Sequence, residues 1–448
     1  MPLTGIEIFK LLPKTNCGRC GEPTCLAFAM KLAAAKAELA ACPDISDAVR
    51  AKLEEAAAPP IRPVTIGTGN SAFKIGGETV MFRHEKRFEN PPGFALLIKD
   101  SMDEPEISAR LERFNQLEYK RVELTLRPEL VAVKDESGDR ARFEATISKV
   151  KENTNASIIL MSPSPDILAA GLKVCAERKP LLYAATRDNL EPVASLARQN
   201  SCPVVARAST LDELARLTAQ LTDSGVNDIV LDSGARSLRQ ALEDQILIRS
   251  TALSKRFRPL GFPTIVFPGE MTDDPMKEAV IASIFVAKYS GIIVLSDFQG
   301  ESLFPLLVER MNIYTDPQRP LAITEGIYPV GNPDENSPVL ITTNFSLTYF
   351  IVSAEIETSK VPSHLLVKDT QGLSVLTAWA GGRFVADTIA PFVKKCGISE
   401  MVKHHKLIIP GYTAIESGSL EEELPGWQIM VGPREGAHIP AYLKTWQP

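Results

Sequence analysis

The chain has 448 residues, of which 44% are apolar and 23% are charged, and its formal net charge is −6. This composition is that of a globular protein, and the length allows two to four domains. The acidic balance and the lack of a Lys/Arg block give no electrostatic reason to expect a nucleic-acid partner. No apolar run approaches the ~20 residues that span a bilayer, and the start, MPLTGIEIFK, lacks the features of a secretory signal. We therefore expect no nucleic acid, no membrane segment and a cytoplasmic location.

The first distinctive feature in chain order is a group of four cysteines near the N-terminus. They have two, four and sixteen residues between successive members and are Cys17, Cys20, Cys25 and Cys42. Cytoplasmic thiols stay reduced, so clustered cysteines indicate metal ligands or redox groups rather than disulfides. Gly18 and Gly21 flank the second cysteine and allow the backbone to turn around ligated sulfurs. Pro43 follows the last one, as in the cysteine run of bacterial ferredoxins.

These four cysteines predict a four-iron, four-sulfur cluster, with structural zinc as the alternative and no metal as a third possibility. Zinc sites usually pair two short knuckles or add histidines, whereas here one knuckle precedes two lone cysteines and no histidine occurs before His84. The segment between Cys25 and Cys42 consists of strong helix formers. One straight helix would hold these two cysteines roughly 24 Å apart. We therefore expect the helix to break near Lys36 and fold back.

The other cysteines occur singly in apolar surroundings, and we expect them to be inert buried residues: Cys175, Cys202 and Cys396. Residues 44–58 predict a helix that is capped near Ser46 or Asp47 and ends at Pro59. Residues 59–92 are rich in proline and glycine, with only short strand-like pieces such as ETVMFR. We interpret them as a linker with at most a small hairpin.

A regular alternation of short apolar strands and amphipathic helical stretches begins at residue 94. The predicted strands are 94–100, 130–135, 157–162, 181–185, 203–206, 228–232, 264–268 and 291–295. Eight strand–helix units favour a closed (β/α)8 barrel, with a doubly wound open sheet as the lesser alternative.

The working face of such a barrel is formed by the loops that follow the strands. Those loops carry Asp100, Asp135, Arg187, Arg207, Asp232, Glu270 and Asp297. No histidine lies between residues 85 and 363, so a histidine-dependent nucleophile is excluded there. Asp232 and Glu270 invite a catalytic interpretation. Helix caps or loop salt bridges are the structural alternative, and lining of a binding surface is the functional one.

The pattern changes after residue 325. The segments 338–350, 363–382, 405–411 and 426–443 contain strands, each followed by a polar or glycine-rich loop. They predict a small open α/β domain. Its loops TTNFS, DTQGLS, IPGYT and VGPREG carry hydroxyls, amides and glycines where open α/β sheets bind ligands.

The cysteine pattern, the eight-unit middle region and the C-terminal TTNFSLTY, TQGLSVLTA and VGPRE together resemble the large (gamma) subunits of corrinoid iron–sulfur proteins of the reductive acetyl-CoA (Wood–Ljungdahl) pathway. The resemblance spans the whole chain. It implies a four-iron, four-sulfur domain over residues 1–58, a linker over 59–92, a TIM barrel over 93–324 and an open, Rossmann-like cobalamin-binding α/β domain over 325–448. Cys17, Cys20, Cys25 and Cys42 would be the cluster ligands.

The resemblance also implies the corrinoid contacts. They are Thr342, Thr343, Thr348, Gly372, Leu373, Ser374, Val375, Leu376, Thr377, Gly432, Pro433, Arg434 and Glu435. The implied partners are a small barrel subunit in a heterodimer, a methyltetrahydrofolate methyltransferase, and acetyl-CoA synthase/CO dehydrogenase. The implied function is that of a methyl carrier: cobalt as Co(I) takes a methyl group from methyltetrahydrofolate through the methyltransferase and delivers it to the nickel cluster of acetyl-CoA synthase. The N-terminal cluster would return accidental Co(II) to Co(I).

No histidine of this chain stands in the D-x-H-x-x-G motif by which many cobalamin domains supply an axial ligand. The C-terminal histidines outside such a motif are His364, His404, His405 and His438. We therefore expect base-off cobalamin without a histidine ligand, which eases reduction to Co(I) because no axial nitrogen stabilises the oxidised metal. Two alternatives of other classes remain: a barrel methyltransferase that binds the pterin itself, and an electron-transfer subunit without corrinoid.

Overall fold

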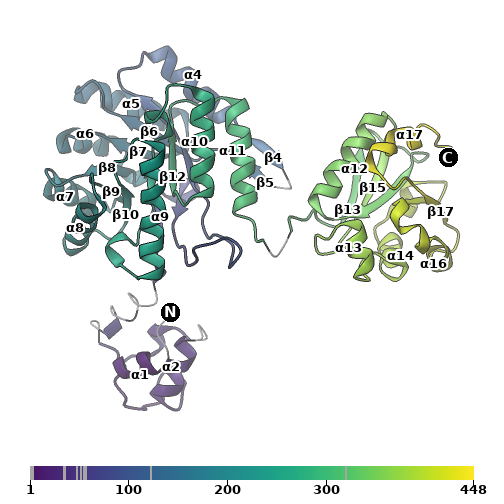
Figure 1. Cartoon of the computed structure of the whole chain (residues 1–448), viewed down its shortest axis with the longest axis horizontal. Helices are drawn as coiled ribbons and strands as arrows, with labels where there is room; N and C mark the ends of the chain where they lie inside the picture. Colours follow the sequence, from purple (N-terminus) through teal and green to yellow (C-terminus); the bar gives the residue numbers. More distant parts are fainter. Residues whose placement is uncertain are drawn as a thin grey trace. The chain divides into compact units, whose positions relative to one another are not determined.

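The computed structural model describes residues 5–33, 37–46, 49–50, 53, 58–121, 124–317 and 320–448. The chain divides into two compact units. The first contains Met1–Met81, Glu89–Phe114 and Glu129–Ser302, and the second contains Phe82–Phe88, Asn115–Pro128 and Leu303–Pro448. Each unit is treated separately below (Figure 1). None of the helices in these described ranges is long and apolar enough to span a bilayer.

The N-terminal part of the first unit contains α1 (Gly5–Leu11), α2 (Cys25–Ala33) and the 3₁₀ turn η1 (Leu39–Ala41). An apolar cluster that includes Ile8, Phe28 and Ala29 holds these elements together. Helix α2 ends at Ala33, and the chain returns through η1, which places Cys42 in the same cluster as Cys25. The predicted fold-back therefore exists, although Lys36 lies outside the described residues.

The helix predicted over 44–58 falls largely outside the described residues, including the proposed cap Asp47. At its start, the other proposed cap is in place: the Ser46 hydroxyl accepts the Val49 N–H at 3.4 Å, and the Ser46 carbonyl accepts the Arg50 N–H at 2.8 Å.

An antiparallel hairpin of β1 (Val64–Ile66) and β2 (Phe73–Ile75) lies within the segment expected to be a linker. Val64, Ile66 and Ile75 are buried among side chains of the barrel strands. The Ser157 hydroxyl, at the start of β7, donates to the Ile66 carbonyl at 3.1 Å. The hairpin thus packs on the N-terminal end of the barrel. The strand-like ETVMFR (residues 78–83) forms no strand, so that part of the expectation was wrong.

The barrel contains all eight predicted strands, in the order β10-β9-β8-β7-β6-β3-β12-β11, and all neighbours are parallel. They are β3 (Gly93–Lys99), β6 (Leu130–Lys134), β7 (Ser157–Met161), β8 (Leu181–Ala185), β9 (Val204–Arg207), β10 (Ile229–Asp232), β11 (Ile265–Val266) and β12 (Ile292–Leu295). A parallel bridge between Leu231 and Thr264 joins the two ends of this order. The TIM-like barrel is therefore confirmed against the open-sheet alternative.

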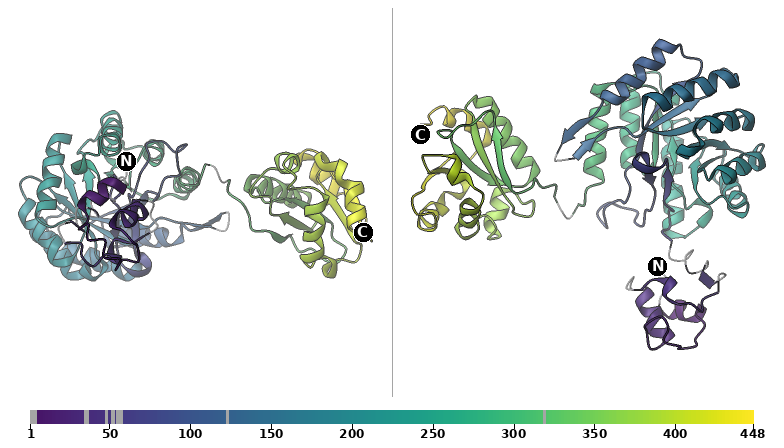
Figure 2. Two further views of the ribbon diagram at one scale, coloured as in Figure 1. Left: turned by 90° about the horizontal axis from the view of Figure 1, so that it is seen from below. Right: turned by 180° about the vertical axis from the view of Figure 1, so that it is seen from behind.

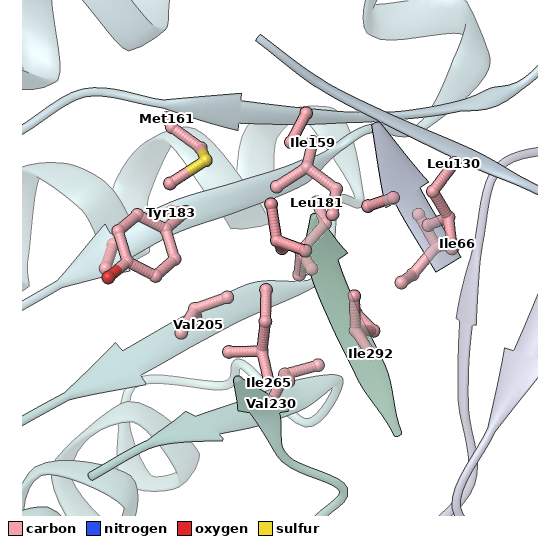
Figure 3. Packing of buried hydrophobic residues seen from close by; sticks show 14 of the residues in the cluster. Ile66, Leu130, Ile159, Met161, Leu181, Tyr183, Val205, Val230, Ile265 and Ile292 are labelled. Atoms are coloured by element: carbon pink, nitrogen blue, oxygen red, sulfur yellow. The ribbon is translucent and has the colours of Figure 1, made fainter. Parts of the chain in front are cut away.

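Helices lie outside the strands of the barrel (Figures 1 and 2). They are α4 (Glu104–Gln116), α5 (Arg140–Asn153), α6 (Pro165–Cys175), α7 (Leu190–Asn200), α8 (Leu211–Asp223), α9 (Leu238–Ser254) and α10 (Pro275–Ala287); α11 (Gly300–Ile313) follows β12 in the chain. Apolar side chains at every second strand position fill the interior, such as Ile159 with Met161 and Leu181 with Tyr183 (Figure 3).

The second unit is built on a five-stranded open sheet in the order β13-β15-β14-β16-β17. Its strands are β13 (Gly326–Val330), β14 (Val339–Thr343), β15 (Ser363–Lys368), β16 (Lys406–Ile409) and β17 (Gln428–Val431). The edge strand β13 is antiparallel to β15 and was not predicted; the other four are parallel. A short hairpin of β4 (Tyr119–Arg121) and β5 (Leu124–Leu126), also not predicted, belongs to this unit.

Two separate apolar clusters cover the two faces of this sheet. One contains side chains of α12 (Ser346–Ser359) and α17 (Ile439–Leu443). The other contains side chains of α13 (Val375–Ala380), α14 (Ala386–Lys395), α15 (Ile398–Met401) and α16 (Ser417–Glu423). The helices accordingly lie on both sides of the strands (Figure 1). The strand order reverses between β14 and β16, and open α/β sheets bind ligands at such a reversal, beyond the carboxyl ends of the strands.

Candidate functional site

The structure gathers the four N-terminal cysteines around one small core. Cys25 and Cys42 are buried, Cys20 is half-buried and Cys17 is exposed. Cys20 packs on the apolar cluster that contains Cys25 and Cys42. The Cys17 sulfur lies 3.6 Å from Asp44 Oδ2, two residues beyond Cys42. Cys20, Cys25 and Cys42 therefore share one small core, and Cys17 lies near a residue that closely follows Cys42.

The donor set suits an iron–sulfur cluster. The Asn16 backbone N–H donates to the Cys25 sulfur at 3.4 Å, as amides do toward ligated sulfurs. Gly18 and Gly21 adopt left-handed φ values of 71° and 81°, which let the backbone turn around Cys20. Hydrogen bonding from the Arg19 backbone N–H, followed by its guanidinium, lowers the pKa of the Cys17 thiol. Among the described residues, however, no three Cys, His, Asp or Glu side chains stand together in metal-binding geometry. The ligand set stays a prediction.

Of the remaining cysteines, Cys175 and Cys202 are buried, as the sequence predicts, whereas Cys396 is only half-buried. Burial raises the pKa of the Cys175 thiol to about 12 and that of Cys202 to about 11. Burial also raises the pKa of the half-buried Cys396 thiol. These thiols stay protonated near neutral pH, so they are poor nucleophiles and metal ligands.

The second unit has a cavity of about 170 Å³ at the carboxyl ends of β14, β16 and β17, where the strand order reverses. Of the predicted corrinoid contacts, the lining includes Thr342, Thr348, Val375, Gly432, Pro433 and Arg434. The lining does not include Thr343, Gly372, Leu373, Ser374, Leu376, Thr377 or Glu435. The sequence missed several lining residues, among them Ile351, Pro410, Tyr412, Gly436 and Ile439. Of these, Pro410 and Tyr412 lie in the IPGYT loop, whose composition was the available signal.

Two buried hydroxyls at the end of β14 have no hydrogen-bond partner within the described chain. They belong to Thr342 and Thr343, which are 1% and 0% exposed. A buried polar group without a partner costs about 1–3 kcal/mol, so such groups call for an explanation. A ligand with polar groups at its edge would satisfy Thr342, which lines the cavity.

Two backbone segments at the cavity also lie very close to each other, the one after β16 and the one after β17. A Cβ on Gly411 would lie 2.6 Å from the Gly432 carbonyl oxygen, and one on Gly432 would lie 2.9 Å from Ile408 Cγ2. Exposed apolar side chains project from the elements that follow the strands: Leu347 and Ile351 in α12, Leu376 in α13, and Tyr412 and Ile415 in η6 (Gly411–Glu416). An apolar ligand surface with hydrogen-bonding groups at its edge, extending over the exposed side chains beside the cavity, matches this combination of residues.

The predicted residues outside the cavity lining lie at the end of β14, in α13 and in the neighbouring loops. The Ser374 and Thr377 hydroxyls are 3.1 Å apart at the start of α13. The Tyr412 hydroxyl donates to Glu435 Oε1 at 2.5 Å, and this hydrogen bond raises the pKa of the Tyr412 phenol. Gly372 follows β15, and its N–H donates to Asn344 Oδ1 at 3.0 Å.

The first unit has a second cavity, of about 410 Å³, at the carboxyl ends of the barrel strands. Beneath it, the buried Asp232 carboxylate accepts the Tyr183 hydroxyl at 2.6 Å and Arg236 Nη2 at 2.9 Å. Glu270 pairs with Arg236 and lies 3.6 Å from Lys134 Nζ. Burial, reinforced by Asp232, raises the pKa of the Tyr183 phenol. The salt-bridge interpretation of Asp232 and Glu270 is therefore correct, and Glu270 also lines the cavity.

The other charged loop residues of the barrel are engaged in similar ways. Asp100 accepts the Glu136 N–H at 2.8 Å, and Asp135 accepts the Ser162 hydroxyl at 2.7 Å. Asp297 pairs with Arg113 at 2.8 Å. Arg187 is exposed, and Arg207 Nε lies 3.7 Å from Asp232 Oδ2. These contacts stabilise the loops at the working end of the barrel.

Comparison with known proteins gives consistent results along the chain. Residues 63–443 match the family described as the CO dehydrogenase/acetyl-CoA synthase delta subunit, and residues 12–43 match a family of Fe-S cluster segments. The chain is 45% identical to the corrinoid/iron-sulfur protein large subunit of Moorella thermoacetica, over 99% of both chains. It is 36% identical to the acetyl-CoA decarbonylase/synthase complex subunit gamma of Methanopyrus kandleri, over 99% of this chain and 97% of that one. Dihydropteroate synthase of Thermus thermophilus aligns with 56% of this chain and all of its own, at 15% identity and a TM-score of 0.40.

Proposed function

This chain belongs to the family of large, or gamma, subunits of corrinoid iron–sulfur proteins, and we propose that it carries methyl groups in acetyl-CoA synthesis on a corrinoid held by its second unit. The observation that carries the proposal is the cavity at the strand-order reversal, where the buried Thr342 hydroxyl has no partner among the described residues. The proposed domains are 1–58 for the cluster, 59–92 as a linker, 93–324 for the barrel and 325–448 as a Rossmann-like corrinoid domain.

When bound, the corrinoid supplies a cobalt that, as Co(I), takes a methyl group from methyltetrahydrofolate through a methyltransferase and passes it to the nickel cluster of acetyl-CoA synthase. The chain's own residues bind and orient that group. Thr342 and Thr348 offer hydroxyls inside the cavity, and Gly432 allows the backbone to approach closely. Buried apolar side chains such as Ile408 and Ile409 exclude water.

Two histidines lie near the starts of strands, and their side chains contact backbone carbonyl groups away from the cavity. His364 is the second residue of β15, and its Nε2 lies 3.1 Å from the Asp334 carbonyl oxygen. His404 precedes β16, and its Nε2 lies 3.0 Å from the Ser337 carbonyl oxygen. Both lie at the amino ends of the parallel strands, whereas the cavity lies at the carboxyl ends. For His364 and His404 this arrangement supports a base-off corrinoid without a histidine ligand; His438, between the lining residues Gly436 and Ile439, is the histidine whose replacement tests it most directly.

The proposed role of Cys17, Cys20, Cys25 and Cys42 is to hold a four-iron, four-sulfur cluster. Such a cluster would supply single electrons that restore the reduced cobalt after accidental oxidation. The proposed partners are a small barrel subunit in a heterodimer, the methyltetrahydrofolate methyltransferase and acetyl-CoA synthase/CO dehydrogenase. The subunit names of the relatives support a complex of this kind. A cytoplasmic location is part of the same proposal.

A barrel methyltransferase that binds a pterin itself is the second candidate, because the barrel has its own cavity of about 410 Å³. The contacts beneath that cavity weigh against it, since Arg236 and Tyr183 already occupy the Asp232 carboxylate. Two measurements decide between the candidates. The carrier predicts corrin absorption bands beside the broad iron–sulfur absorption, and stoichiometric methyl release from the methylated protein. Turnover with methyltetrahydrofolate and no added methyltransferase would instead support the barrel enzyme.

A further inference from the structure

One side chain connects the carboxyl end of β14 with the loop that follows β15, and predicted corrinoid contacts lie beside both. Asn344 directly follows β14 and is only 4% exposed. Its backbone is fixed on both sides, because its N–H donates to the Lys368 carbonyl at 2.9 Å and its own carbonyl accepts the Ile323 N–H at 2.8 Å. The side chain therefore leaves the sheet from a rigid position.

The Asn344 amide uses both of its ends on the loop after β15. Its Oδ1 accepts the Thr370 N–H at 3.0 Å, the Thr370 hydroxyl at 3.1 Å and the Gly372 N–H at 3.0 Å. Its Nδ2 donates to Asp369 Oδ1 at 2.9 Å. An amide has its acceptor and its donor on two separate atoms. An ionised carboxylate has no donor, and a hydroxyl has both functions on a single atom, so neither can replace the amide in these contacts.

The loop that Asn344 binds needs such support. Gln371 and Gly372 both have left-handed backbone conformations, with φ values of 60° and 74°, and the former is costly for a residue with a side chain. The loop leads into α13, whose first residue, Val375, lines the cavity. The position of that wall relative to Thr342 on β14 therefore depends on the Asn344 contacts.

We propose that Asn344 is a positioning residue of the corrinoid site, which holds the Thr370–Gly372 turn against the end of β14 through an amide that accepts from the turn and donates to Asp369. The inference rests on the proposed corrinoid-binding function. It adds a residue that is not part of the cavity lining and acts through the loop it binds.

The test is Asn344→Asp in the full-length chain together with its partner subunit, with aquocobalamin as the probe in equilibrium dialysis. The new carboxylate would face Asp369 without a proton to donate. Glu325, which pairs with Lys368 at 2.6 Å and accepts the Asp369 N–H at 2.8 Å, adds a further carboxylate nearby. Loss of this part-buried hydrogen bond to a charged group, with two carboxylates left facing each other, predicts a fall in cobalamin affinity of about 10- to 100-fold. The matched control is Asn332→Asp, an exposed asparagine on the loop after β13, which should bind like the wild type.

A swap separates positioning from a general loss of structure. In Asn344→Asp/Asp369→Asn the donor and the acceptor change places, so we expect cobalamin affinity to recover in part. The Gln371 N–H, which donates to Asp369 Oδ1 in the wild type, would then donate to water, because Gln371 is exposed. Should Asn344→Asp fail to fold, Asp369→Ala, at an exposed position, should still weaken cobalamin binding several-fold.

The outcomes are distinct. Unchanged affinity in Asn344→Asp or in Asp369→Ala overturns the inference, and so does a double variant that binds no better than Asn344→Asp. Wild-type protein that takes up no cobalamin overturns the proposed function itself, which is a separate result.

Discussion

The closest backbone approach in the cavity wall makes a sharp prediction about Gly411. This residue starts the turn after β16, and its N–H donates to the Pro433 carbonyl at 3.0 Å in the loop after β17. In Gly411→Ala the new methyl group would lie 2.6 Å from the Gly432 carbonyl oxygen and 2.8 Å from the Arg434 nitrogen. Both are backbone atoms, so the two loops must separate by about 0.8 Å to reach ordinary contact distance.

Overpacking of this kind costs about 1–3 kcal/mol of unfolding free energy, and it displaces the wall that carries Arg434. We expect cobalamin affinity to fall by at least about tenfold, which corresponds to ~1.4 kcal/mol of binding free energy. Gly418→Ala is the matched control, because no heavy atom lies within 4 Å of its added methyl group. Gly418 is in α16, where alanine should stabilise by about 0.5–1 kcal/mol and leave binding unchanged.

Equilibrium dialysis measures the affinity, and tryptophan fluorescence during urea unfolding measures the stability. The fluorescence reports on the second unit alone, because all three tryptophans lie there: Trp379, Trp427 and Trp446. Wild-type affinity and stability in Gly411→Ala would refute the argument that this contact sets the width of the cavity.

Four further predictions concern the cofactors, the partner and the barrel. Cys20→Ala should abolish the intact four-iron cluster while corrinoid uptake persists, as measured by iron content and corrin absorbance; joint loss of both would show that the two sites are not independent. Electron paramagnetic resonance of the Co(II) state should lack nitrogen splitting, and a triplet removed by any one histidine replacement would contradict the absence of a histidine ligand. The histidines to replace are His364, His404, His405 and His438. The chain alone should bind cobalamin weakly and the heterodimer tightly, because one small open sheet covers one face of the macrocycle; equal affinities in dialysis would be inconsistent with this. Arg249→Met should leave the buried Glu78 carboxylate, which lies 3.1 Å from Arg249 Nη2, without its ion-pair partner. This should destabilise the first unit by about 3–5 kcal/mol at pH 8. Burial already raises the folded-state pKa of Glu78, and loss of Arg249 raises it further. The contribution of Glu78 to the free energy of unfolding is therefore fully present below its unfolded-state pKa, and it is lost as the pH rises through its folded-state pKa. The deficit, measured by scanning calorimetry, should therefore shrink toward pH 5, and a pH-independent deficit would exclude this cause.

The sequence by itself determined the features that local patterns encode. The eight barrel strands were predictable because a parallel strand covered on both faces is a short apolar run, and polar helix-forming segments separate these runs. The N-terminal cysteines were visible through their spacing, and the fold-back after α2 followed from the distance that a straight helix would impose. The loops of the C-terminal sheet were visible through their composition.

Tertiary structure alone decided how separate segments meet. The hairpin of Val64–Ile66 and Phe73–Ile75 has too few apolar residues to stand out from a linker, and it is buried only because the barrel end accepts it. Which loop residues line the cavity depends on the strand order, which brings β14 beside β16 although about sixty residues separate them. The contacts of Asn344 with Asp369 and of Asp232 with Tyr183 are likewise long-range pairings of side chains. Periodicity and spacing report each residue's own neighbourhood along the chain, whereas such pairings exist only after the sheets have formed.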